Sequence, residues 1–239
     1  MPADLEMLPV LALFLARVVS GYAICLALIG PRITAGSWPR VSLFVIAGLS
    51  FAAFAAGAHW MSLVVAGLAL LMERARTFSV PVLSSTWWML PAGLGLWAAH
   101  EITYAGGWPP NVAGLAGGIA AGGTLGTMLL GHSYLTARGL SFKPLQFMAK
   151  LLFVLLIARA LHVGIVLSMA ERLGGDWIYI SARIAFGLFL PLVFGWMVLQ
   201  CVKIESNQSA TGILYAMTAL VGCGELIAAF LQVESGLFV

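Results

Sequence analysis

The segment WPRVSLFVIAGLSFAAFAAGAHWMSLVVAGLALLME, residues 38–73, decides how many times this chain crosses a membrane. It is apolar almost throughout. It is too long for one ordinary membrane-spanning helix of about 20 residues and short for two. A break in the sequence GAHW, at Gly57–Trp60, would fold it into a tight helical hairpin. Without that break, the segment would be a single long, tilted helix.

The composition of the whole chain places it in a membrane. Of its 239 residues, 62% are hydrophobic and 9% are charged, and the mean hydropathy is +1.02. Soluble domains are about 25% charged, so this chain lacks the residues for a water-facing surface. Apolar runs outside the opening segment predict spans near 8–30, 80–104, 111–137, 144–170, 179–202 and 210–232.

The distribution of basic residues favours the hairpin, and therefore eight spans. Cytoplasmic loops carry an excess of Lys and Arg. With eight spans one side receives Arg32, Arg40, Arg74, Arg76, Arg138, Lys143, Lys150 and Lys203. We therefore predict an all-α integral membrane protein, a polytopic bundle of eight transmembrane helices (seven if residues 38–73 form one long helix). We expect one transmembrane domain over residues 1–239 without a soluble domain. It would lie in a bacterial inner membrane, with both termini on the outer side.

The predicted span near 111–137 has an unusual glycine face. Gly114, Gly118, Gly122 and Gly126 recur every four residues, as overlapping G-x-x-x-G motifs. This pattern lets another helix approach closely in lipid, which is the preferred interpretation. Alternatively, Gly114 and Gly118 make room for a flat ring such as a haem or a quinone.

A histidine and an arginine follow this glycine face towards the cytoplasmic end. His132 shares the face of Gly114 but lies near the end of the predicted span, shortly before Arg138. We interpret His132 and Arg138 as polar residues of the cytoplasmic side.

Ionisable residues within the spans are costly in lipid and usually have a partner or a function. Arg159, Arg183 and Glu225 lie at similar predicted depths, and one interpretation, the rival of the cofactor site described next, is a buried ion pair between the arginines and the carboxylate. Such a pair either fixes helix packing or serves as a proton or substrate relay. Arg17 lies in the first span, and Glu101 closes the fourth.

The histidines of the outer half suggest a second kind of site. His100 and His162 form the best pair by depth for the two axial ligands of a b-type haem, with His59 as a substitute. Arg159 and Arg183 would then pair with the haem propionates. A quinone pocket using His and Glu for proton exchange is the alternative.

Three function hypotheses remain open from the sequence. The first is a subunit of a bacterial electron-transport complex, respiratory or photosynthetic, holding a b-type haem or a quinone near the outer face. The second is a small transporter or channel using the buried Arg, Glu and His residues. The third is a cofactor-free scaffold subunit. All three predict contact with the bilayer, and the short loops favour other membrane or periplasmic subunits as partners. No independent catalytic motif and no nucleic-acid-binding basic run occurs in the sequence.

Overall fold

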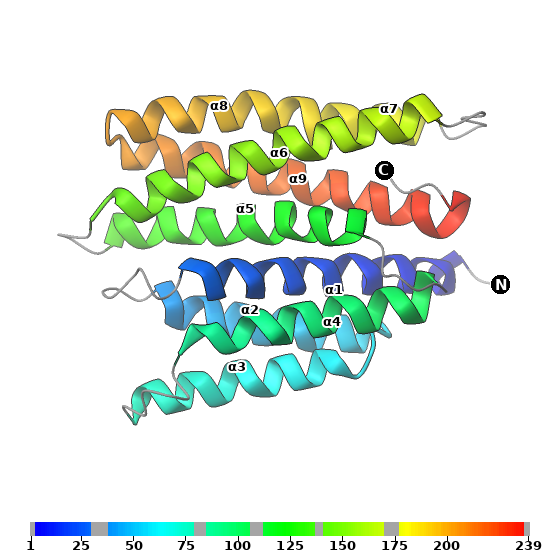
Figure 1. The fold of residues 1–239 in the computed structure, drawn as a ribbon, viewed down its shortest axis with the longest axis horizontal. Helices are drawn as coiled ribbons and strands as arrows, with labels where there is room; N and C mark the ends of the chain where they lie inside the picture. Colours follow the sequence, from blue (N-terminus) through cyan, green and yellow to red (C-terminus); the bar gives the residue numbers. More distant parts are fainter. Residues whose placement is uncertain are drawn as a thin grey trace.

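The structure is a computed structural model that describes residues 3–29, 38–78, 85–105, 112–136, 141–169 and 177–236. In these ranges the chain forms a bundle of eight antiparallel helical rods and no strand (Figure 1). The elements are α1 (Ala3–Ile29), α2 (Trp38–Ala55), α3 (Met61–Thr77), η2 (Thr86–Trp88), α4 (Met89–Ala105), α5 (Val112–Thr136), α6 (Lys143–Met169), α7 (Trp177–Ile184), η4 (Ala185–Phe189), α8 (Leu190–Lys203) and α9 (Asn207–Ser235). The π-helical turn η4 joins α7 to α8, so that residues 177–203 make one rod.

The break in the opening segment is a glycine-dependent helix end. α2 ends at Ala55, and Gly57 adopts φ +96°, a conformation that glycine accepts without steric cost. The amide of Ala58 donates to the carbonyl of Ala53 at 2.9 Å, which is the 6→1 hydrogen bond of a Schellman cap. α3 then begins at Met61 and runs back along α2. The prediction of a hairpin, and with it of eight helices, is confirmed.

The lengths of the helices identify a multi-pass membrane protein. Within the described ranges, six of the eight rods are long and apolar enough to cross a membrane. The other two, α3 and α4, have 17 residues each. The preceding turn η2 extends α4 to residues 86–105, which approaches a full span. Large apolar side chains exposed around the bundle are then in contact with lipid.

The first helix is the centre of the bundle. Its apolar stretch is 83% buried, the highest share among the six long rods of the described ranges. Its backbone lies against the glycine face of α5: a Cβ atom on Gly118 would fall on the carbonyl of Arg17, and one on Gly122 would reach the backbone of Val18 and Tyr22. The glycines therefore let α1 and α5 approach closely, which was the preferred interpretation of their spacing.

The two ends of the bundle differ in charge. α1 begins and α9 ends at the same end, which we call the termini end (Figure 1). The opposite end, the basic end, carries Arg40, Arg74, Arg76, Lys143, Lys150 and Lys203. Arg32 and Arg138, expected at the same end, lie outside the described residues.

Candidate functional site

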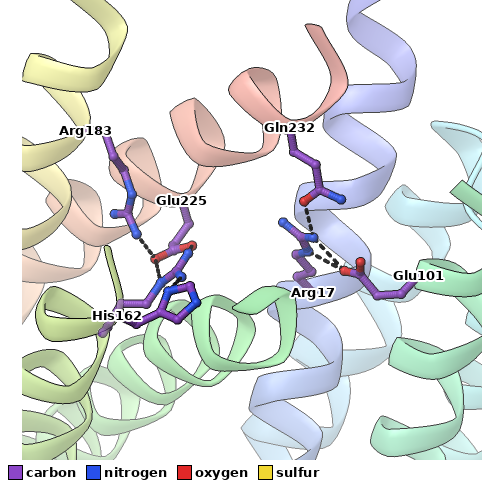
Figure 2. Close-up of polar contacts among 7 residues, drawn as sticks. Arg17, Glu101, His162, Arg183, Glu225 and Gln232 are labelled. Atoms are coloured by element: carbon purple, nitrogen blue, oxygen red, sulfur yellow. Dashed lines mark hydrogen bonds and ion pairs between the residues drawn. The ribbon is translucent and has the colours of Figure 1, made fainter. Parts of the chain in front are cut away.

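Among the described residues, the buried arginine, glutamate and histidine side chains other than Glu73 gather towards the termini end, and Figure 2 shows their polar contacts. Two groups of contacts are drawn there. The Glu225 cluster consists of Arg159 and His162 on α6, Arg183 on α7 and Glu225 on α9. The Arg17 cluster consists of Arg17 on α1, Glu101 on α4 and Gln232 on α9.

Two guanidinium groups share one carboxylate in the Glu225 cluster. Arg183 donates through Nη2 to Glu225 Oε1 at 2.7 Å. Arg159 donates through Nη2 to Oε2 at 3.1 Å and through Nε to Oε1 at 3.3 Å, which is a bidentate contact. The three side chains are at most 5% exposed. The structure thus brings together the three residues for which the sequence predicts an ion pair.

Arg183 has hydrogen-bonding capacity that the described residues do not use. Its side chain is fully buried, yet neither Nε nor Nη1 has an acceptor within the described part of the chain. A buried guanidinium donor without an acceptor has lost its hydrogen bonds to water and has no protein hydrogen bond to replace them, which costs free energy. Arg183 therefore retains donors for one more oxygen-bearing or anionic group.

The backbone around Arg183 departs from α-helical geometry. The π-turn Ala185–Phe189 starts two residues after Arg183, and Pro191 follows it at the start of α8. A Cβ atom on Gly187 would fall on Arg183 Nη1 and would lie 2.8 Å from the Cα atom of Gly224. The glycines at these two positions let the seventh rod touch α9 and leave room for the guanidinium between them. π-Turns are often found at functional sites.

His162 connects the Glu225 cluster to the outside of the bundle. Its Nδ1 atom lies 3.3 Å from Arg159 Nη1, and its ring is half-buried. Its neighbours on α6, Leu161 and Ile165, are exposed. A lipid-soluble group could therefore reach His162 from the bilayer side of α6.

The Arg17 cluster pairs the arginine of the central helix with a carboxylate 84 residues later. Arg17 Nε donates to Glu101 Oε1 at 2.7 Å, and Nη2 lies 2.6 Å from the same oxygen as part of the ion pair. Nη2 donates its hydrogen bond to the side-chain oxygen of Gln232. Gln232 was not identified from the sequence. It follows Glu225 by seven residues, two helical turns, so both face the same side of α9 and lie about 10 Å apart along its axis.

Helix α5 begins between the two clusters. A Cβ atom on Gly114 would lie on the contact between Arg17 and Glu101, and one on Gly117 would reach Glu225 and Arg159. α5 begins short of the end reached by α1 and α9 (Figure 1). The positive dipole end of α5 therefore lies deep in the bundle, beside two carboxylates.

The structure corrects the alternative in which Gly114 and Gly118 form a slot for a ring. Gly118 lies against the backbone of α1, and Gly114 lies against the Arg17 cluster. No space for a haem or a quinone ring is left on that face of α5, because a neighbouring helix and its ion pair occupy it.

The histidines proposed as haem ligands are not brought together. His100 is buried on α4, next to Glu101, whereas His162 is on α6. α1 and α5 lie between these two helices (Figure 1), and Figure 2 shows His162 and Glu101 on opposite sides of Arg17. The residues therefore do not fit a haem ligated by His100 and His162. Equal depth in the membrane did not make them neighbours.

The two remaining histidines lie elsewhere. His59 is in the α2–α3 turn, where its Nδ1 accepts from the amide of Met61 at 3.3 Å. His132 lies in the half nearer the basic end, as expected, and its Nδ1 is 2.9 Å from the hydroxyl of Tyr215. Within the described ranges, no group of three or more His, Cys, Asp or Glu residues is arranged to hold a metal ion.

Fold and site together define a polytopic α-helical membrane protein with buried ion pairs that join α1, α4, α6, α7 and α9. Comparison of the sequence with protein-family models and curated proteins, and of the chain with solved structures, gives no match. The functional argument therefore depends on the site itself.

Proposed function

We propose that this chain is a small membrane transport protein that binds an anion at the Glu225 cluster. The observation that supports it most directly is Arg183, a fully buried guanidinium with two nitrogen atoms that lack an acceptor among the described residues. An anion at this point would accept those hydrogen bonds and offset the cost of a second arginine at a single carboxylate.

The depth of the cluster suits a binding site reached from the termini end. Glu225 and Arg159 each lie ten residues from the helix end at that side, about 15 Å along the axis. The π-turn beside Arg183 and the deep start of α5 add irregular backbone and a positive helix end near the same level. Transporters commonly build substrate sites from interrupted helices and from the amino ends of helices.

The orientation belongs to the same proposal. Positively charged segments are retained in the cytoplasm, so the basic end would be cytoplasmic and both termini would face the outside of a bacterial inner membrane. The Glu225 cluster would then take up its anion from the outer side.

Anion flux from reconstituted vesicles tests this function. Vesicles containing the full chain are loaded in turn with chloride, nitrate and phosphate, and efflux is followed under a potassium gradient with valinomycin. Arg183→Gln removes the free donors and should reduce flux by about tenfold or more, as expected for losing charged hydrogen bonds. Arg183→Lys keeps the charge and should restore part of the flux. Lys203→Gln, an exposed residue at the basic end, is the matched control.

The results separate the possible roles of the cluster. The transport proposal is overturned if the parent and Arg183→Gln give equal flux. The thermal unfolding midpoints of the parent and of Arg183→Gln show that both proteins are folded in this comparison. Absence of flux for all three anions in the parent overturns it as well, and favours a role of the cluster in helix packing.

His162 favours a second candidate function, a quinone-binding subunit of an electron-transport complex. Its ring is half-buried between exposed apolar neighbours and contacts Arg159, so a quinone carbonyl arriving through lipid would find a hydrogen-bonding partner. Other membrane or periplasmic subunits would be its partners. A reduced-minus-oxidised spectrum and extraction of bound quinone from natively purified protein test this function. A flat spectrum and an extract without quinone overturn it.

A further inference from the structure

A groove at the basic end lies between α2 and α3, far from the two ion-pair clusters. It has a volume of about 520 Å³, and its walls include Arg40 and Phe44 on α2 and Leu70, Leu71, Glu73 and Arg74 on α3. In Figure 1, α3 is at the edge of the bundle. We refer to this cavity as the Arg40 groove.

The Arg40 groove is amphiphilic along the membrane normal. Its charged residues are at the helix ends: Arg40 in the first turn of α2 and Arg74 in the last turn of α3. Phe44 and Leu70 lie one turn further into the bundle, about 6 Å deeper, and are 49% and 40% exposed. The groove thus changes from basic at the headgroup level to apolar at the level of the acyl chains.

The charged rim has an unbalanced positive charge. Arg40 and Glu73 form an ion pair, with 2.8 Å between Nε and Oε1, so the charges of these two residues cancel. For Arg74, no carboxylate oxygen of the described residues lies within 4 Å. Its guanidinium lies 4.9 Å from the centre of the Phe78 ring, and the exposed Arg76 is in the same turn. The rim therefore offers hydrogen-bond donors and net positive charge to an anionic group.

We propose that the Arg40 groove binds an anionic phospholipid. The phosphodiester accepts hydrogen bonds from Arg74, and one acyl chain lies over Phe44 and Leu70. Basic pockets between transmembrane helices on the cytoplasmic side are a common form of anionic headgroup site. A zwitterionic lipid has no net negative charge to interact with the basic rim. Inorganic phosphate has no acyl chain to contact the apolar half of the groove.

Lipid retention tests the proposal. The full chain is placed in nanodiscs of phosphatidylcholine with a minority of phosphatidylglycerol, released into mild detergent, and examined by native mass spectrometry. Arg74→Gln should reduce the retained phosphatidylglycerol about fivefold, because one cationic contact at the membrane surface is lost. Lys150→Gln, an exposed basic residue on α6 at the same end, should retain as much as the parent. Arg40 is left unchanged so that Glu73 keeps its partner.

A second variant distinguishes a lipid from a free anion. Leu70→Trp fills the apolar half and leaves every charge in place, so phosphatidylglycerol should be lost while the basic rim remains. Retention that is equal in the parent, Arg74→Gln and Leu70→Trp overturns the proposal. Displacement of the lipid by inorganic phosphate alone, or equal loss in Lys150→Gln, also overturns it, since binding would then depend on charge without the groove.

Discussion

Arg183 and Glu225 meet at 2.7 Å between the seventh rod and α9, and Arg159 reaches the other side of the same carboxylate. Three helices that are separate in sequence are therefore joined at one residue. The contact is buried between helices of the bundle, with all three side chains at most 5% exposed. Glu225 is thus the carboxylate that the buried arginines of α6 and α7 share.

Replacing this carboxylate should be strongly destabilising. Glu225→Gln removes the carboxylate that pairs with two buried guanidinium groups, and loss of one partner of a buried pair typically costs about 3–5 kcal/mol. Unfolding in detergent, followed by circular dichroism against temperature and denaturant, measures the change. Glu234→Gln, an exposed position on the same helix, should change stability by less than about 0.5 kcal/mol. Equal unfolding midpoints for Glu225→Gln and Glu234→Gln would show that the ion pairs of Glu225 do not stabilise the protein.

A double-mutant cycle should reveal coupling between Arg17 and Glu101. Arg17→Leu removes the cation that pairs with the buried Glu101, and Glu101→Leu leaves Arg17 with Gln232 as its hydrogen-bond partner among the described residues. Each single variant should lose about 3 kcal/mol or more, whereas the double variant, with neither charge, should recover part of that loss. Losses that simply add would mean that the two side chains do not interact in the folded protein.

Two glycine-to-alanine changes should have opposite effects on stability, because only one of these glycines lies where α1 packs on α5. Gly118→Ala would place a Cβ atom on the carbonyl of Arg17, so the helices must separate, at a cost of about 1–3 kcal/mol. Gly164→Ala, in α6, meets no described atom within 4 Å and should be neutral or stabilising by up to about 1 kcal/mol. The thermal midpoints of both variants are compared with the parent. A Gly118→Ala protein as stable as the parent would contradict the close contact.

Cysteine labelling checks the orientation. With Cys25, Cys201 and Cys223 replaced by serine, Glu234→Cys at the termini end should react with an impermeant maleimide added outside spheroplasts. Gln208→Cys, near the basic end, should react only after the cells are opened. The reversed pattern would place the basic end outside.

Most of the fold could be predicted from the sequence, because a membrane imposes a length on each apolar run. Predicting the hairpin at Gly57 required the distribution of basic residues as well as the length of the apolar segment, and both favoured a break there. The burial of Trp38 shows the limit of such reasoning: its indole N–H donates to the carbonyl of Gly126 at 3.0 Å, a contact that composition alone does not indicate.

The site could be predicted only in part. Charge and depth sufficed for Arg159, Arg183 and Glu225, since buried ions need partners. Depth could not tell which helices are neighbours, so His100 and His162 were paired although α1 and α5 separate them. Gln232 carries no charge and lies near a helix end. Its seven-residue spacing from Glu225 was the one available signal.

The order of Arg159, Arg183 and Glu225 along the chain has a consequence for biosynthesis. Arg159 and Arg183 precede Glu225 by 66 and 42 residues. At about 5–20 residues per second, these arginines are made roughly 2–13 seconds before their counter-charge. Until α9 is inserted, Arg159 and Arg183 lack the Glu225 carboxylate in a medium that disfavours charge, and a chain truncated before α9 would never gain it. Insertion of α9 therefore acts as an assembly checkpoint, by which chains that include Glu225 differ electrostatically from chains that have not yet reached it.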